Sequence, residues 1–265
     1  MKTLLINPPS PDFVVFEYNI IPSSLLYLAS SLQEKGEKVR ILDINNDITN
    51  LKKQGRINTK EYLYGKLEEE LLSFNPDFVG ISCLFSGRFK PTIDIARRVK
   101  NQGDIPIVLG GMHPTIFPRE ILQEYSCVDY VCIGEGERTL VDLVRGKNPE
   151  KIDGLAYRKG IEVRLNPKTS FIKDLDSLSF PAYGLIELED YYFDTSSWDN
   201  PKGIPLNNPV PILTSRSCPQ QCTFCSMHLV HGKSWRPRSA ENVVDELDML
   251  VNKYGHKFFT LLMII

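Results

Sequence analysis

The 265-residue sequence lacks the features that mark membrane, secreted and nucleic-acid-binding proteins. No stretch approaches the roughly 18 apolar residues of a membrane span. The N-terminus is apolar for only about four residues, which is too few for the apolar region of a signal peptide. Lys and Arg total 31 against 33 for Asp and Glu, so no basic surplus favours a nucleic-acid partner. We therefore expect a cytoplasmic protein with no membrane and no nucleic-acid partner.

Cysteines are few, but they are clustered. Three of the six lie within eight positions, at Cys218, Cys222 and Cys225. Thiols stay reduced in the cytoplasm, where such a cluster favours metal or redox chemistry over a disulfide framework. Apolar residues make up 42% and charged residues 24% of the chain. These fractions are typical of a globular protein with a buried core.

The first half of the sequence alternates short apolar runs with stretches of helical periodicity. Strands are predicted at residues 3–7, 38–43, 78–82, 105–109 and 129–133. Helices are predicted at residues 23–35, 60–74, 92–100, 118–123 and 137–145, the first with Ser23 or Ser24 as its N-cap. This alternation predicts an α/β fold with a doubly wound, parallel five-stranded sheet of the flavodoxin-like type.

Glycine and polar residues follow three of the predicted strands. These residues are Ser82 and Leu84 after the third strand, Gly110 and Gly111 after the fourth, and Gly134, Glu135 and Gly136 after the fifth. Sheets of this kind bind ligands beyond the carboxyl ends of their strands, and glycines let a backbone approach a bulky ligand closely. Any one group could be no more than a turn. Three groups at one edge favour a ligand cradle.

We divide the chain into three parts. Residues 1–150 form the Rossmann-type domain, residues 151–209 a hairpin and a linker, and residues 210–265 the start of a second α/β unit. The hairpin is predicted at 152–165. The second unit has a strand at 210–215, the cysteine loop, a helix at 241–254 and a further strand from about residue 257. Ser239 is predicted to cap that helix, and Gly255 to end it.

The cysteine loop has the spacing Cys-x3-Cys-x2-Cys and follows a predicted strand. Three thiolates can hold three irons of a 4Fe–4S cluster and leave the fourth iron open, as a catalytic centre requires. Zinc is the alternative, because His228 or His231 can supply a fourth ligand beside the three cysteines. The spacing by itself leaves both metals open.

At this point the sequence resembles a known family. The motif, with Phe224 before its last cysteine, resembles the Cys-x3-Cys-x-aromatic-Cys signature of the radical S-adenosylmethionine superfamily. Residues 236–239 and 243–247 are similar to the segment that leads from this loop along the first barrel helix. Ser82-x-Leu84 and Gly110-Gly111 resemble two motif pieces of the cobalamin-binding domain that precedes the radical domain in one subgroup. Residues 174–176 and 180–183 are similar to that subgroup's connector.

The resemblance implies which residues bind which cofactor. Cys218, Cys222 and Cys225 would ligate a 4Fe–4S cluster whose free iron binds S-adenosyl-L-methionine, and Phe224 would pack near the adenine. The cradle residues named above would contact cobalamin. The domain that follows would be a radical S-adenosylmethionine (β/α) partial barrel.

The resemblance also implies a chemistry. An electron donor such as flavodoxin or ferredoxin would reduce the cluster, which would cleave S-adenosylmethionine to a 5'-deoxyadenosyl radical. Cobalamin would carry a methyl group to an unactivated carbon of a small-molecule substrate, which the sequence does not identify. The protein would position these groups and exclude water.

Four features depart from the family pattern. Ser217 precedes the first cysteine where the family has glycine, and a positive φ there would strain a serine. The loop at residues 7–12 contains no histidine, so we expect cobalamin without a histidine ligand to cobalt, and we interpret His113 as a loop residue. The barrel would need about six βα units, but the sequence supplies one and the start of a second. The apolar end, residues 258–265, lacks the acidic residues that the family tends to place there.

We therefore expect a chain that is C-terminally truncated relative to the family, and we do not expect catalysis by these residues alone. Two alternatives follow from the same observations. One is a non-catalytic module that binds a corrinoid through residues 1–146. The other is a zinc-stabilised interaction protein that uses the three cysteines with His228 or His231.

Overall fold

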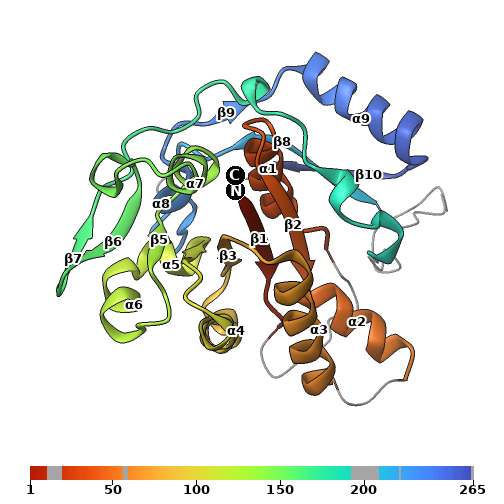
Figure 1. Cartoon of the computed structure of the whole chain (residues 1–265). Helices are drawn as coiled ribbons and strands as arrows, with labels where there is room; N and C mark the ends of the chain where they lie inside the picture. The colour runs from red at the N-terminus through yellow and green to blue at the C-terminus, as the bar shows by residue number, and fades with distance from the viewer. Residues whose placement is uncertain (11–19, 56–58, 192–208, 221, 264–265) are drawn as a thin grey trace.

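The main sheet has seven strands and follows the predicted α/β pattern (Figure 1). The structure is a computed structural model that describes residues 1–10, 20–55, 59–191, 209–220 and 222–263. The strands of this sheet are β1 (Lys2–Asn7), β2 (Lys38–Asp43), β3 (Phe78–Ser82), β4 (Ile107–Gly110), β5 (Tyr130–Cys132), β6 (Leu155–Lys159) and β7 (Glu162–Leu165). Their spatial order is β2-β1-β3-β4-β5-β6-β7.

The five predicted strands pair in parallel, as expected from the sequence. The predicted hairpin is present as β6 and β7, and it continues the sheet because β6 pairs antiparallel with β5. The fourth strand begins at Ile107, two residues later than predicted, after Pro106, which has no N–H to donate to a central strand. The order β2-β1-β3-β4-β5 reverses direction between β1 and β3, and ligands bind at such a switch point.

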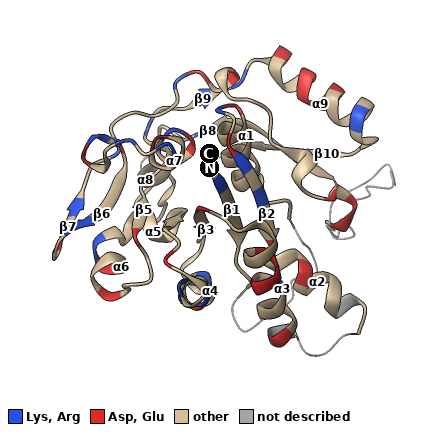
Figure 2. Ribbon diagram, in the orientation of Figure 1, with Lys and Arg blue, Asp and Glu red and all other residues tan. Residues whose placement is uncertain are grey.

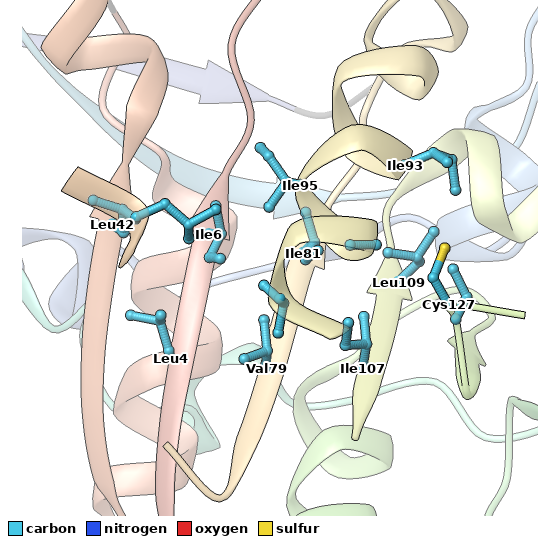
Figure 3. Close-up of a cluster of buried hydrophobic side chains, with 14 of the residues drawn as sticks. Leu4, Ile6, Leu42, Val79, Ile81, Ile93, Ile95, Ile107, Leu109 and Cys127 are labelled. Atoms are coloured by element: carbon cyan, nitrogen blue, oxygen red, sulfur yellow. The ribbon is translucent and has the colours of Figure 1, made fainter. Parts of the chain in front are cut away.

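Helices cover both faces of this sheet. The α-helices of this half are α1 (Ser23–Gln33), α2 (Ile44–Lys53), α3 (Thr59–Phe74), α4 (Phe89–Gln102), α5 (Met112–Ile116), α6 (Pro118–Glu124) and α7 (Glu137–Val144). Helices α2, α3, α4 and α6 bury one face in a cluster that includes Ile6, Ile81 and Leu109 (Figure 3). Helices α1 and α7 cover the other face, where Leu5 and Val108 pack. The successive residues Leu4, Leu5 and Ile6 are therefore all buried, as is typical of a parallel sheet.

The helices differ from the prediction in several details, among them the short helix α5, which was not predicted. Helix α1 has Pro22 as its N-cap and begins at Ser23, and no side chain caps it. Helix α2 was not predicted, because its Asn-rich sequence favours turns. It forms because Ile44, Ile48 and Leu51 recur at helical spacing and are buried.

The second unit is a three-stranded sheet with the order β10-β8-β9. It comprises β8 (Val210–Arg216), α8 (Met227–His231), β9 (Arg236–Pro237), α9 (Ala240–Tyr254) and β10 (Phe259–Met263). Strands β8 and β10 are parallel, and β9 pairs antiparallel with the end of β8. Both predicted ends of α9 are confirmed: the Ser239 hydroxyl accepts a hydrogen bond from the Asn242 amide, and Gly255 is left-handed.

The described residues also form short 3-10 helices between these elements. They are η2 (Ser86–Arg88), η3 (Pro149–Lys151), η4 (Leu175–Ser177), η5 (Tyr183–Leu185) and η6 (Leu188–Asp190). The last three belong to the predicted linker, whose residues 192–208 lie outside the described residues, as do residues 11–12 of the predicted loop after β1 and residues 264–265 of the apolar end.

Two linker tyrosines join the two units. The Tyr183 hydroxyl donates a 2.7 Å hydrogen bond to Oε1 of Glu246 on α9. The Tyr191 hydroxyl donates a 2.9 Å bond to Oδ2 of Asp43, the last residue of β2. Both tyrosines pack in a third apolar cluster that also contains Leu26 of α1 and Ile212 of β8. The linker therefore forms part of a packed interface between the units.

Charged residues of both signs are interspersed over the molecule (Figure 2). Helix α9 shows this mixture, with Glu241, Asp245 and Lys253 along its length. Within the described ranges, no helix combines the length and the apolar character that are needed to cross a membrane.

Candidate functional site

A cavity of about 550 Å³ lies between the carboxyl ends of the main sheet and the second unit. All seven residues of the predicted cradle line it: Ser82, Leu84, Gly110, Gly111, Gly134, Glu135 and Gly136. The second unit contributes Leu213, Arg216, Met227, Val230, His231 and Leu262. The structure thus brings the predicted cradle residues together and adds a wall that the sequence did not predict.

The inner part of the cavity is apolar. It extends between the sheet, at Leu5, Gly80 and Val108, and the facing helices, at Leu28 of α1 and Leu140 of α7. At Gly80 a Cβ would lie 2.8 Å from Cδ2 of Leu5, so a larger residue there would require the Leu5 side chain to shift. A ligand that fills this cavity therefore needs an extended apolar part as well as a part that lies at the strand ends.

The cradle positions are occupied by glycine for different physical reasons. Gly111 has a φ of 106°, and a Cβ there would lie 2.7 Å from the carbonyl oxygen of Cys83. Gly134 has a φ of 74°, and its Cβ would lie 3.0 Å from the carbonyl oxygen of Val230. Both positions require glycine for the backbone itself. At Gly110 the φ is ordinary and a Cβ would have only one neighbour, Cβ of Cys132 at 3.9 Å. Its missing side chain leaves the cavity open.

The cysteine loop begins at a strained residue. Ser217 is fully buried and has a φ of 71°, which confirms the positive φ considered from the sequence. Its hydroxyl donates a 2.6 Å hydrogen bond to the carbonyl oxygen of Gly232. Residues 217 and 232 therefore form the neck of the loop. Phe224 is 91% exposed, so its aromatic ring is free to cover a ligand.

The three loop cysteines are free thiols. Cys222 is exposed, and Cys218 and Cys225 are half-buried. The amide of Gln220 lies 3.4 Å from the sulfur of Cys218 and donates to it. Gln221, which was part of the predicted polar loop, lies outside the described residues. The loop therefore offers three soft, accessible sulfur ligands, the donor set of an iron–sulfur cluster.

The zinc alternative needs a histidine beside the three cysteines. In the described parts of the chain, no three His, Cys, Asp or Glu side chains converge on a single point where one ion would bind. The Nδ1 atom of His231 lies 3.3 Å from Oε1 of Glu135, so this ring is engaged away from the cysteines. Of the two histidines considered as a fourth zinc ligand, His231 is therefore engaged elsewhere, and the three cysteines remain available to an iron–sulfur cluster.

A buried ion cluster joins the cradle to the cysteine loop. Arg236 donates from Nη2 to Oε1 of Glu135 at 2.7 Å and from Nη1 to Oε2 at 3.1 Å. Nη1 of Arg216 lies 3.5 Å from Oε1 of the same carboxylate. The amide of Ile172 donates to Oε2 at 3.0 Å. Burial by itself raises the pKa of Glu135, but hydrogen bonds from His231 and Arg236 and the charge of Arg216 hold this pKa well below its ordinary value.

Glu137 is the second acid of this cluster. Its Oε1 accepts a 2.6 Å hydrogen bond from Nη2 of Arg216. Burial lowers the pKa of Arg216, but the charges of Glu137 and Glu135 outweigh it and raise the pKa, so that the guanidinium stays charged. Arg216, Arg236 and Glu137 were not among the site residues predicted from the sequence. The available clue was the acidic pair directly after a buried strand, together with an arginine just before the first cysteine.

Polar side chains also line the cavity near β1. Arg88 donates to Oδ1 of Asn7 and to Oγ of Ser10, each at 3.3 Å. Burial raises the pKa of Asp43 to about 6, although hydrogen bonds from the Asn46 amide, Tyr191 and Asn7 oppose that rise. This end of the cavity therefore offers hydrogen-bonding groups and one cation to a ligand.

His113 was interpreted from the sequence as a loop residue, and the structure corrects this, because the residue belongs to a short helix. It lies on α5, where its ring packs against Phe89 at 4.4 Å and Phe117 at 5.0 Å between centroids. Its Nδ1 is 3.0 Å from Oγ of Ser86. His113 does not line the cavity among the described residues. Its role is in packing.

Comparison with known proteins agrees with this geometry. Residues 10–144 match the family of B12 binding domains. An uncharacterized methyltransferase of Pyrococcus horikoshii is 32% identical over 97% of this chain and 52% of its own length. An anaerobic magnesium-protoporphyrin IX monomethyl ester cyclase of Cereibacter sphaeroides is 31% identical over 74% of this chain and 31% of its own length. The chain thus spans about half or less of the length of these relatives.

A solved structure shares the fold. It is the radical S-adenosylmethionine methyltransferase TsrM from Kitasatospora setae, with cobalamin and a 4Fe–4S cluster bound. It matches with a TM-score of 0.70 at 18% sequence identity, over 99% of this chain and 48% of that one. The match covers both units, so the arrangement of a cobalamin-type domain followed by a second α/β unit is shared.

Proposed function

Because the chain belongs to the B12-binding domain family, we propose that its cavity binds cobalamin and that its cysteine loop binds a 4Fe–4S cluster with S-adenosyl-L-methionine. The chain would then be part of a cobalamin-dependent radical S-adenosylmethionine methyltransferase. One observation carries the proposal: the glycine cradle and the residues that frame the cysteine loop line the same cavity. The three cysteines do not line the cavity themselves, so a cluster would lie beside a corrinoid held there.

The corrinoid would be held by two kinds of residue. Gly110 and Ser82 would leave room for the ring and contact its edge at the strand ends. The apolar inner part of the cavity, between Gly80 and Leu28, would hold the extended tail of the cofactor. Among the described residues that line the cavity, the histidine is His231, which already faces Glu135. The engagement of His231 with Glu135 supports cobalamin binding without a histidine ligand to cobalt.

The cluster would be held by Cys218, Cys222 and Cys225, with the fourth iron left for S-adenosylmethionine. When bound, the cluster supplies the electron that cleaves S-adenosylmethionine, and cobalamin supplies methyl transfer. The residues of this chain would bind and orient these groups, and the cavity would exclude water. Phe224 would cover the adenine with its exposed ring.

The proposal extends to the reaction and its partners. The substrate would be a small molecule with an unactivated carbon that accepts a methyl group. A reducing protein such as a flavodoxin or ferredoxin would supply the electron, in a reducing compartment such as the cytoplasm. The free thiols of the loop are consistent with that compartment.

Anaerobic reconstitution with iron and sulfide tests the cluster. The full chain should bind close to four irons and gain the broad visible absorbance of an iron–sulfur cluster. Cys222→Ala should lose both, whereas Cys127→Ala, which alters a buried thiol outside the loop, should retain them. A normal cluster in the Cys222 variant, or stoichiometric zinc without sulfide in the wild-type chain, would refute the ligand assignment.

Hydroxocobalamin binding tests the cavity separately. The full chain should retain hydroxocobalamin on gel filtration and shift its visible spectrum. Corrinoid binding without any iron would favour the alternative of a non-catalytic corrinoid-binding module, which the cavity also supports. No retention and no spectral change would remove cobalamin from both functions.

A further inference from the structure

Glu135 occupies a particular place between the two parts of the proposed site. It lies between Gly134 and Gly136 of the cradle, and it is almost fully buried. Its carboxylate accepts two hydrogen bonds from Arg236 and lies 3.5 Å from Arg216. These arginines are direct partners in the β8–β9 ladder. One carboxylate of the first unit therefore holds both strands of that ladder.

Those strands enclose the cysteine loop. Arg216 is the last residue of β8, two positions before Cys218, and Arg236 is the first residue of β9, where the chain returns. The Ser217–Gly232 hydrogen bond closes the neck between them. Arg236 also donates from Nη2 to the carbonyl oxygen of His231 at 2.7 Å, which fixes the end of α8. The Glu135 carboxylate thus holds the residues that precede and follow segment 217–232, namely Arg216 and Arg236.

A second contact joins the other glycine loop to the far end of the cysteine motif. Met112 follows Gly111, and its Sδ atom lies 2.7 Å from Oγ of Ser226, which donates to it. Ser226 directly follows Cys225. Each of the two glycine loops therefore contacts one flank of the cysteine motif.

The Glu135 contact has the physical properties of a positioning device. A bidentate arginine–carboxylate pair fixes both distance and orientation, which a lysine or an exposed pair does not. The pair is buried, so solvent does not screen it. If the carboxylate charge is removed, the buried guanidinium of Arg236 loses its counter-ion, whereas Arg216 keeps Glu137. A buried charge left without its partner is strongly destabilising.

We propose that Glu135 is a positioning residue, whose carboxylate fixes the cysteine loop against the glycine cradle and so sets the position of the cluster relative to the corrinoid. This inference rests on the proposed function for the identity of the two cofactors. Its structural part, the anchoring of residues 217–232, does not depend on any cofactor.

Hydrogen–deuterium exchange of the full chain without cofactors tests the anchoring. Glu135→Gln should speed amide exchange in residues 217–232 by about tenfold or more, because the loop opens when its anchor is lost. Glu246→Gln is the matched control: Glu246 is also a buried carboxylate, paired with Arg238 at the same interface between units. It should speed exchange in α9 and leave residues 217–232 within about twofold of wild type.

Two results would overturn the anchoring. One is unchanged exchange of residues 217–232 in Glu135→Gln, and the other is an equal increase in both variants. If Glu135→Gln does not fold, Arg236→Lys provides the same test, because it keeps the charge and loses the bidentate geometry. It should speed exchange of the same segment by a smaller factor, and no effect would count against the proposal.

A spectroscopic measurement tests the cofactor part. With both cofactors loaded, the electron paramagnetic resonance spectrum of the reduced wild-type cluster should show magnetic coupling to cob(II)alamin. Glu135→Gln should keep its iron content, because the three cysteines are intact, and at saturating cobalamin its coupling should be weaker or broader than that of wild type. Unchanged coupling would refute the proposal that Glu135 sets the position of the cluster relative to the corrinoid. Failure of the wild-type chain to load either cofactor would refute the proposed function and leave the exchange result standing.

Discussion

Ser217 closes the cysteine loop on Gly232 from a left-handed backbone conformation. Its φ is 71°, and its buried hydroxyl donates a 2.6 Å hydrogen bond to the Gly232 carbonyl oxygen. A non-glycine residue in this region is strained by about 1–2 kcal/mol. The hydroxyl contributes a hydrogen bond of about 1 kcal/mol. The serine therefore offsets most of the strain that its own backbone introduces, which explains how the chain tolerates it.

This balance predicts different effects for two substitutions. Ser217→Ala keeps the strain and loses the hydrogen bond, so its free energy of unfolding should fall by about 1–2 kcal/mol. Ser217→Gly loses both, so its free energy of unfolding should stay within about 0.5 kcal/mol of wild type. Urea unfolding of the two variants measures the difference. Equal stability of Ala and Gly at this position would show that the strain is absent.

The two neighbouring glycines of the cradle should respond differently to alanine. Gly111→Ala places a Cβ 2.7 Å from the Cys83 carbonyl oxygen at a positive φ, so it should lower the free energy of unfolding by about 2 kcal/mol or more. Gly110→Ala meets no close neighbour and should fold normally. Its methyl group should reduce the affinity for hydroxocobalamin, because it extends toward the cavity. Normal affinity in a folded Gly110→Ala would place the corrinoid elsewhere.

Asp43 should make the free energy of unfolding fall as pH rises, the reverse of the effect of a carboxylate whose pKa is lowered on folding. Its pKa is raised from 3.8 to about 6 in the folded chain, chiefly by burial. Between these values the folded state holds a proton that the unfolded state has lost, so the contribution of Asp43 to stability falls as pH rises through that range. Relative to Asp43→Asn, the wild-type chain should lose on the order of 2 kcal/mol between about pH 4 and pH 7.

Urea unfolding of both proteins across that range measures the effect. Asp104→Asn changes a fully exposed carboxylate and serves as the control, with a curve parallel to that of wild type. A constant difference between wild type and Asp43→Asn at every pH would show that Asp43 titrates normally in the folded chain.

Much of the first unit could be predicted from local sequence. Short runs such as Leu4-Leu5-Ile6 are apolar on both faces, which is typical of parallel strands. The alternating helices, the cap at Ser239 and the stop at Gly255 follow from neighbouring residues alone. Helix α2 was missed because its Asn residues favour turns, whereas the burial of Ile44 and Ile48 depends on a sheet that local sequence does not describe.

The sequence by itself determined the cysteine motif, the glycine cradle and the order of strands and helices, because each depends on the chemistry of residues that are close in the chain. Tertiary structure alone decided that the cradle shares one cavity with Arg216 and His231, which flank the cysteine motif. It also decided the pairing of Glu135 with Arg236, which are 101 positions apart. A charge at such a separation can find its partner only when packing brings two surfaces together, and burial then makes that pairing obligatory.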